Sequence, residues 1–382
     1  MRRLLLLSAG LLLLPNLANA VDCDIGDALT HSFSSGASWQ MCARVDDTHG
    51  LELQSIHYRA PGDSLRSVLS SIHLAEALLH YHEDSNAIAL ISEQGLGGAA
   101  INTQSSATCT GNTVSLANAS SALCSVVEPA GILAKYGNRQ AIHADKWTLS
   151  LSSTVPTFNL STSITFTEDG RIEPSSELSG RVSRFTDSAD FGNRVDSTNR
   201  YASRATLLYT WRMDFALNTA DANDRVEEFD YTISFGASEQ RPMTITSLDV
   251  ETFRDVERNR FRGWRILDPN GSGYYLDPQN NGYSYVSRDY NWAQFDLAIT
   301  RSNDCERLAL NNEATSGVAC GESLDDYVNG ESLNGARPTL WFSITRLFNP
   351  NRADFPAIQT LDATFELLPF DWTSTSPFEV IQ

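Results

Sequence analysis

The sequence has few long apolar runs, and this absence bears on membrane association. After residue 20, no apolar segment approaches the 18 or so residues that a membrane-spanning helix requires. We therefore expect no membrane span in residues 21–382. The one apolar run, Leu4–Leu14, follows two arginines and precedes small residues at 18–20, which is typical of a secretory signal peptide. We expect cleavage after Ala20 and export to the periplasm or the cell exterior.

Basic residues are also scarce. The chain has 28 Lys and Arg against 47 Asp and Glu, for a formal net charge of −19. Without Arg2 and Arg3 of the expected signal peptide, the balance is 26 − 47 = −21. Such a surface repels phosphate backbones, so nucleic acid is not an expected partner. The same charge keeps an exported protein soluble and favours cationic partners.

No two cysteines have the Cys-x-x-Cys spacing of a cysteine-based metal site. All six cysteines follow residue 20, and an even number in an exported protein suggests disulfides. Among the connectivities that six cysteines allow, pairing of neighbours is the simplest, and each bridge would then close a local loop. The pairs would be Cys23–Cys42, Cys109–Cys124 and Cys305–Cys320.

No Pro/Ser-rich linker, low-complexity segment or internal repeat divides the chain, so residues 21–382 are interpreted as one large all-β domain. In residues 147–155 and 158–166, apolar side chains alternate with Ser, Thr and Asn, as in strands with one buried face. Glu168-Asp169-Gly170 then predicts a turn into a third strand. The same pattern predicts a hairpin over 38–53 and strands at 205–215, 295–299 and 340–344.

Three other segments carry different signals. Leu65, Val68, Leu69, Ile72, Ala75 and Leu79 follow helical spacing after Ser64, which predicts a short helix. Residues 83–125 are polar and Gly-rich and are expected to form a loop held by Cys109–Cys124. Residues 181–204 are charged and are expected to form a solvated excursion.

Several segments, in the same order, resemble the catalytic domain of copper amine oxidases. The resemblance extends over roughly residues 38–378 and rests on the order of the segments, because each alone is short. The segments, with the family patterns, are His73–Tyr81 (SLAEMVVPY), Gly131–Lys135 (GILAK), Thr154–Asn159 (T-[IV]-G-N-Y-[DE]), Asp169–Glu173, Glu177–Gly180, Arg225–Glu228 (RVEEED), Asp296–Arg301 (DLWVTRY), and 340–356 with 368–370 near the end.

This resemblance implies a large antiparallel β-sandwich, a homodimer, and an enzyme that oxidises primary amines with copper and topaquinone, a quinone made from its own tyrosine. Three sets of positions depart from the family. The quinone tyrosine is replaced by Phe158, and no tyrosine lies between Tyr136 and Tyr201. Phenylalanine has no phenolic oxygen to ionise or coordinate. The catalytic base, an aspartate in the family, corresponds to Leu90, with Glu93 nearby as a displaced acid.

The family's three copper-binding histidines correspond to Ala205, Leu207 and Phe348, whose side chains offer copper no imidazole nitrogen. Register does not change this conclusion, because His143 is the last histidine of the chain. No cofactor is therefore expected. The sequence predicts a copper amine oxidase-like pseudoenzyme that binds or assembles with an unidentified protein or small molecule.

Two alternatives stay open. One is an enzyme with altered chemistry that uses Glu93, Asp214 or the His80/His82 pair. The other is a periplasmic metal-handling protein, for which His80 and His82 would point to the same side of an extended segment. Asp214 also resembles the first acid of the family's peripheral calcium pattern. Asp221, Asn223 and Asp224 follow it closely.

Overall fold

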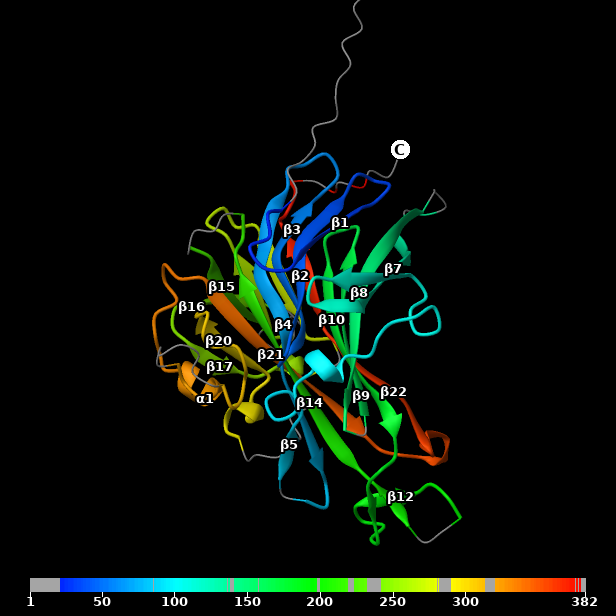
Figure 1. Cartoon of the computed structure of the whole chain (residues 1–382). Helices are drawn as coiled ribbons and strands as arrows, with labels where there is room; N and C mark the ends of the chain where they lie inside the picture. The colour runs from blue at the N-terminus through cyan, green and yellow to red at the C-terminus, as the bar shows by residue number, and fades with distance from the viewer. Residues whose placement is uncertain are drawn as a thin grey trace, which may run out of the picture.

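The computed structural model describes residues 21–84, 86–135, 137, 141–156, 158–197, 200–218, 223–231, 242–279, 281, 290–312, 320–374, 376 and 378. The expected signal peptide, residues 1–20, lies outside them, as does Asp221. Within these residues the fold is almost entirely antiparallel β-structure, which confirms the predicted fold class. Two large sheets pack face to face as a sandwich (Figure 1).

The first sheet has nine strands among the described residues, in the order β1-β2-β3-β4-β14-β21-β20-β17, with β5 paired to β4. The strong patterns at 38–53 and 205–215 form strands β2, β3 and β14 of this sheet. Its strands are β1 (Asp27–Ser32), β2 (Ser38–Asp46), β3 (Gly50–Arg59), β4 (Arg66–Tyr81), β5 (Ala87–Ala89), β14 (Ala205–Phe215), β17 (Thr252–Arg254), β20 (Leu297–Arg301) and β21 (Pro338–Phe348).

The second sheet has eleven strands in the described part of the chain, in the order β16-β15-β18-β19-β23-β10-β9-β8-β7-β6, with β22 paired to β10. The alternating run at 147–180 forms its centre. Its strands are β6 (Asn112–Leu116), β7 (Ala119–Ala134), β8 (Ile142–Val155), β9 (Phe158–Thr167), β10 (Ile172–Arg181), β15 (Arg225–Tyr231), β16 (Met243–Leu248), β18 (Gly263–Leu267), β19 (Gly273–Asp277), β22 (Ala357–Thr364) and β23 (Glu366–Phe370).

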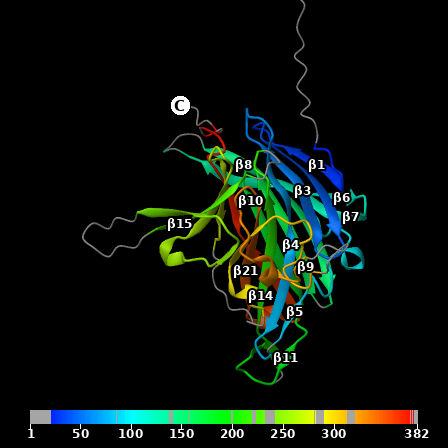
Figure 2. The same cartoon turned by 90° about the vertical axis from the view of Figure 1, so that its left-hand side faces the viewer.

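A small three-stranded sheet lies at one end of the molecule (Figure 2). It consists of β11 (Phe185–Thr186), β12 (Gly192–Arg194) and β13 (Tyr201–Ser203), so part of the expected solvated excursion at 181–204 is ordered as strand. The helices are short: η1 (Gly98–Ala100), η2 (Arg258–Arg260), η3 (Trp292–Gln294), α1 (Leu324–Tyr327) and η4 (Arg352–Asp354). No helix among the described residues has the length and apolarity to cross a membrane.

The core lies between the two sheets, and aromatic side chains fix the sheets to each other with hydrogen bonds. Trp39 Nε1 on β2 donates to Thr167 O on β9 at 2.9 Å. Tyr58 Oη on β3 donates to Glu168 O at 3.0 Å, and Trp211 Nε1 on β14 donates to Ser176 Oγ on β10 at 3.1 Å. Each ring thus buries its apolar surface while its polar atom remains hydrogen-bonded.

The helix predicted from Ser64 to Leu79 is wrong, because this segment forms strand β4. β4 pairs with β3 on one side and with β14 on the other. Its residues from Ile72 to Leu79 are buried on both faces, so the run is almost continuously apolar. A strand buried on both faces gives no alternation, and its apolar spacing cannot be distinguished from that of a buried helix.

The loop predicted over 83–125 is also only partly correct, since β5, β6 and the first residues of β7 lie within it. β14 also differs from the prediction. Its alternating pattern predicts one solvent-exposed face, made of its polar residues. Thr206, Thr210, Arg212 and Asp214 are all at most 4% exposed. A second apolar cluster covers this outer face of the first sheet, with Leu208 and Trp341 of the sheet against Trp292 and Tyr327.

The three disulfides are Cys23–Cys42, Cys109–Cys124 and Cys305–Cys320, the pairing of neighbours. No described cysteine is free. Disulfides persist in oxidising compartments, so this is consistent with a periplasmic or extracellular protein.

The turn between β9 and β10 provides a test of the packing. Gly170 has a φ of +93°, and a Cβ there would lie 2.7 Å from Tyr58 Cε1 and 2.9 Å from Pro369 Cγ. Gly36 has a similar φ of +95° but nothing within 4 Å of such a Cβ, so it is a matched control. We predict that Gly36→Ala lowers the free energy of unfolding by about 1 kcal/mol, through backbone strain alone.

Gly170→Ala should lower the free energy of unfolding by a further 1–3 kcal/mol or so, because the buried Tyr58 ring must also move. Urea denaturation of both variants measures the difference. Equal losses would show that the turn does not pack as described.

Candidate functional site

The three positions that the resemblance assigns to copper lie side by side. Ala205 and Leu207 are two residues apart on β14, and Phe348 on β21 is the register partner of Ala205. All three are buried in the core between the sheets. Methyl, isobutyl and phenyl groups carry no donor atom, so these three positions do not fit a copper ion.

The positions assigned to the quinone and the base are apolar as well. Phe158 is the first residue of β9, pairs with Val155 and Gly180, and is 7% exposed. Leu90 is 3% exposed, and its backbone N–H donates to Ala77 O at 2.9 Å. Both side chains belong to the same core as the copper positions. Glu93, the displaced acid, is exposed.

A polar row crosses the outer face of the first sheet, away from this core. Arg44 on β2 is the register partner of Glu52 on β3, and Glu52 is the partner of His73 on β4. His73 is in turn the partner of Arg212 on β14. Since side chains alternate along a strand, these four residues share one face of the sheet.

His49 joins this row from the turn between β2 and β3. The turn forms because Asp46 Oδ1 accepts the backbone N–H of Thr48 at 2.9 Å. His49 Nε2 then lies 2.9 Å from Glu52 Oε2, and His49 Nδ1 lies 3.2 Å from Asp46 Oδ1. The His49 ring stacks on the His73 ring, with 4.1 Å between centroids and 26° between planes. His49, Glu52 and His73 are at most 3% exposed, and we call them the His-Glu-His cluster.

Two arginines neutralise the carboxylate of this cluster. Arg44 Nε and Arg307 Nη2 lie 2.8 Å and 2.7 Å from Glu52 Oε2. Gln54 Nε2 donates to the other oxygen, Oε1, at 2.7 Å. Burial opposes ionisation of Glu52, but the hydrogen bond from His49 and the charge of Arg307 outweigh it and hold its pKa far below the usual range. Glu52 is therefore a carboxylate throughout the physiological pH range.

His73 is held as a neutral imidazole. Its Nε2–H donates to Arg307 O at 2.9 Å, because a carbonyl oxygen can only accept. Burial, and then the neighbouring His49, lower the pKa of His73 well below its ordinary value. The second ring nitrogen, Nδ1, is buried and has no hydrogen-bond partner. His73 thus carries an unshared electron pair in a buried position.

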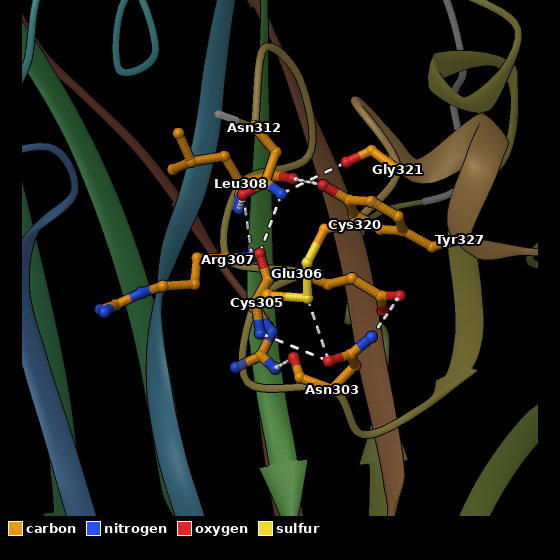
Figure 3. Close-up of a disulfide and its surroundings, with 10 residues drawn as sticks. Asn303, Cys305, Glu306, Arg307, Leu308, Asn312, Cys320, Gly321 and Tyr327 are labelled. Carbon is orange, nitrogen blue, oxygen red and sulfur yellow. Dashed lines mark hydrogen bonds between the residues drawn. A yellow bond between two sulfur atoms is a disulfide. The ribbon is translucent and has the colours of Figure 1, made fainter. Parts of the chain in front are cut away.

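The cluster lies beside a pocket of about 770 Å³, whose lining includes His49, Asp46, Arg307, Glu322 and the disulfide Cys305–Cys320. Figure 3 shows how the segment around the disulfide is held. Asn312 Nδ2 donates to Cys305 O at 2.9 Å and to Gly321 O at 3.3 Å (Figure 3). The Arg307 side chain points away from the disulfide (Figure 3). Its Nη2 lies 2.7 Å from Glu52 Oε2.

Comparisons with known proteins identify a family with the same fold as this chain. The sequence profile described as copper amine oxidase, enzyme domain, matches residues 34–381. The chain belongs to the copper amine oxidase family. A search of curated protein sequences gave no match.

Solved amine oxidase structures share the fold at low sequence identity. The copper-containing benzylamine oxidase of Hansenula polymorpha superposes with a TM-score of 0.75 at 15% identity, over 95% of this chain and 65% of that one. The Aspergillus nidulans amine oxidase gives 0.71 at 17%, over 97% and 56%. The Pichia pastoris lysyl oxidase gives 0.73 at 16%, over 97% and 56%. This copper amine oxidase homologue thus spans less than two thirds of the length of these structures.

The His80/His82 pair of this copper amine oxidase homologue lies at the end of β4. The ring centroids are 6.4 Å apart. His80 Nε2 contacts Asp84 O and His82 Nε2 contacts Thr206 Oγ1, each at 2.9 Å. Within the described residues, no further His, Cys, Asp or Glu completes a group of three potential ligands with them. The pair therefore stays a prediction.

Asp214 is engaged by protein groups. Its carboxylate accepts from Ser71 Oγ at 2.5 Å and also from Arg212 Nη1 and Thr339 Oγ1. Asp224 instead accepts the backbone N–H of Leu217 at 2.9 Å. Because Arg212 already balances the charge of Asp214, a calcium ion there would have to displace a buried guanidinium.

The sequence alone does not identify Glu52 or His73 as site residues, and it does not predict that they contact His49. The helix prediction placed His73 on the wrong kind of element, and the register that joins Glu52 to His73 depends on pairing between strands. One available signal was the spacing of His49 and Glu52, which are three residues apart across a tight turn.

A buried carboxyl group near the Leu90 position gives a second test. Glu76 is fully buried and accepts the backbone N–H groups of Ala77, Ile91 and Ser92 at 2.8, 2.9 and 3.2 Å. Burial raises its pKa from 4.5 to about 7, although these hydrogen bonds lower it. The folded protein therefore holds this proton more tightly than the unfolded chain, so the contribution of Glu76 to stability falls as the pH rises through this range.

Glu76→Gln removes this titration. We predict that raising the pH from 5 to 8 shifts the stability of the variant relative to the wild type by up to about 3 kcal/mol in favour of the variant. Urea denaturation of both proteins at the two pH values measures the shift. Parallel pH dependences would show that Glu76 does not titrate in this range.

Proposed function

We propose that this protein is a copper amine oxidase homologue that does not oxidise amines and that acts by binding a ligand or a partner. The observation that carries the proposal is the adjacency of Ala205, Leu207 and Phe348, which fill with apolar side chains the place where the resemblance puts copper. A fold does not carry a function when the site chemistry is missing.

The chemistry of the quinone supports the same proposal. The cofactor of the family begins as a phenol that is oxygenated beside copper, and Phe158 offers neither a hydroxyl group nor a metal neighbour. Shifts in alignment do not restore the site, because the chain has no histidine after His143 and no tyrosine between Tyr136 and Tyr201.

An enzyme of another kind receives less support. Glu93 is exposed at the surface, and Asp214 is paired with Arg212 on the outer face of the sheet. Neither carboxylate is free and enclosed beside a pocket, as a general base requires. The pocket beside His49 and Arg307 is polar, and it is the place where we expect a small ligand or a partner residue to bind.

Phe158→Tyr provides the direct test. We predict that the variant, incubated aerobically with copper, develops no visible quinone absorbance, because no imidazole ligand holds copper beside the new phenol. The wild type and the variant should also release no hydrogen peroxide from a panel of primary amines. A copper-containing benzylamine oxidase, treated in the same way, is the positive control.

Quinone absorbance in Phe158→Tyr, or peroxide release from the wild type, would overturn the proposal. The copper content of the purified protein is not a test of this proposal, since a metal ion can bind elsewhere on the molecule.

A further inference from the structure

We propose that His49, Glu52 and His73 form a binding site for a divalent transition-metal ion of the zinc type. Each residue offers one ligand atom, and these atoms lie within 4.8 Å of one another. The site is on the outer face of the first sheet, whereas Ala205 and Leu207 face the core. It is therefore a different site from that of the family's copper, and it does not depend on the proposed loss of amine oxidation.

The donor set suits zinc. Two imidazole nitrogens and one carboxylate oxygen bind Zn²⁺ in sites that leave a fourth position for water or another ligand. Calcium and magnesium prefer sets made only of oxygen atoms. The pocket beside His49 provides the access route and room for the fourth ligand.

In both histidines, the ring nitrogen that would not bind the metal makes a contact of the kind that orients metal ligands. A metal-binding histidine typically donates its other ring N–H to a carboxylate or a backbone carbonyl. His73 Nε2–H donates to Arg307 O at 2.9 Å, and His49 Nδ1 lies 3.2 Å from Asp46 Oδ1. His73 therefore presents Nδ1 to a cation. His49, once its ring proton is on Nδ1 toward Asp46 instead of on Nε2 toward Glu52, presents Nε2.

Two features of the cluster call for a cation. His73 Nδ1 is buried without a partner, and an unpaired buried polar atom is destabilising. His49 Nε2 and Glu52 Oε2 are 2.9 Å apart, and a shared cation can take the place of the His49 proton that joins them. A bound zinc ion satisfies both.

Arg307 is the competitor for this position. Its Nη2 lies 2.7 Å from Glu52 Oε2 and 3.3 Å from His49 Nε2, so its guanidinium occupies part of the space that the ion needs. Its side chain is 32% exposed, and the acidic Glu322 lines the same pocket. The ion binds when Arg307 swings into the pocket, while Arg44 stays on Glu52 and limits the change in charge.

The test is a titration of the full mature chain with Zn²⁺, after removal of bound metal with a chelator, followed by calorimetry. The wild type should bind one equivalent, and zinc should raise its Tm. His49→Gln and Glu52→Gln should each weaken binding at least about tenfold. His82→Gln, which changes a histidine outside the cluster, should leave the affinity unchanged.

Arg307→Gln distinguishes a metal site from a purely structural ion-pair cluster. Removing the competing charge should tighten zinc binding by about tenfold or more, whereas a structural role predicts only lost stability. This variant also keeps the proposal testable if Glu52→Gln does not fold.

Absence of zinc binding by the wild type would overturn the proposal. Binding that is weakened by His82→Gln but not by His49→Gln would do the same, and would move the site to the end of β4. Neither result bears on amine oxidation, which quinone absorbance and peroxide release measure separately.

Discussion

Burial of strand β14 on both faces is the constraint on which the rest of the structure depends. β14 lies between β4 and β21 at the centre of the first sheet (Figure 1). One face packs into the core of the sandwich, and side chains that include Trp292, Leu310 and Tyr327 cover the other. A buried strand can carry charged residues only if they are paired, because an unpaired charge away from water is strongly destabilising. Arg212 and Asp214 meet this condition by binding each other.

The two faces of the sheet consequently have opposite characters. On the core face, Ala205, Leu207 and Phe348, the positions that the resemblance assigns to copper, carry apolar groups and contribute to packing. On the outer face, the ionisable groups of the His-Glu-His cluster gather beside a pocket that the Cys305–Cys320 segment helps to line. The ionisable cluster therefore lies on the opposite face of the sheet from the positions that the resemblance assigns to copper.

Much of the fold could be predicted from local sequence. The hairpin of β2 and β3 and the run of β8, β9 and β10 each have one buried face, so alternation identifies them. β4 was misassigned because burial on both faces removes the alternation. The expectation that Phe158, Ala205, Leu207 and Phe348 depart from the family rests on residue identity alone, because the side chain decides whether a donor atom exists. The His-Glu-His cluster was not readable, since its members meet through register between strands and a turn.

The sequence by itself thus determined the fold class, the family resemblance and the kinds of atom at each family position, because these depend on residue identity and local periodicity. Only the tertiary structure decided that Ala205 lies opposite Phe348 and that the polar face of β14 is buried under a second apolar cluster. It also decided that Glu52 lies between two arginines and two histidines. Such contacts join residues far apart in the chain. Strand order and register set them, and neither is encoded in any one local segment.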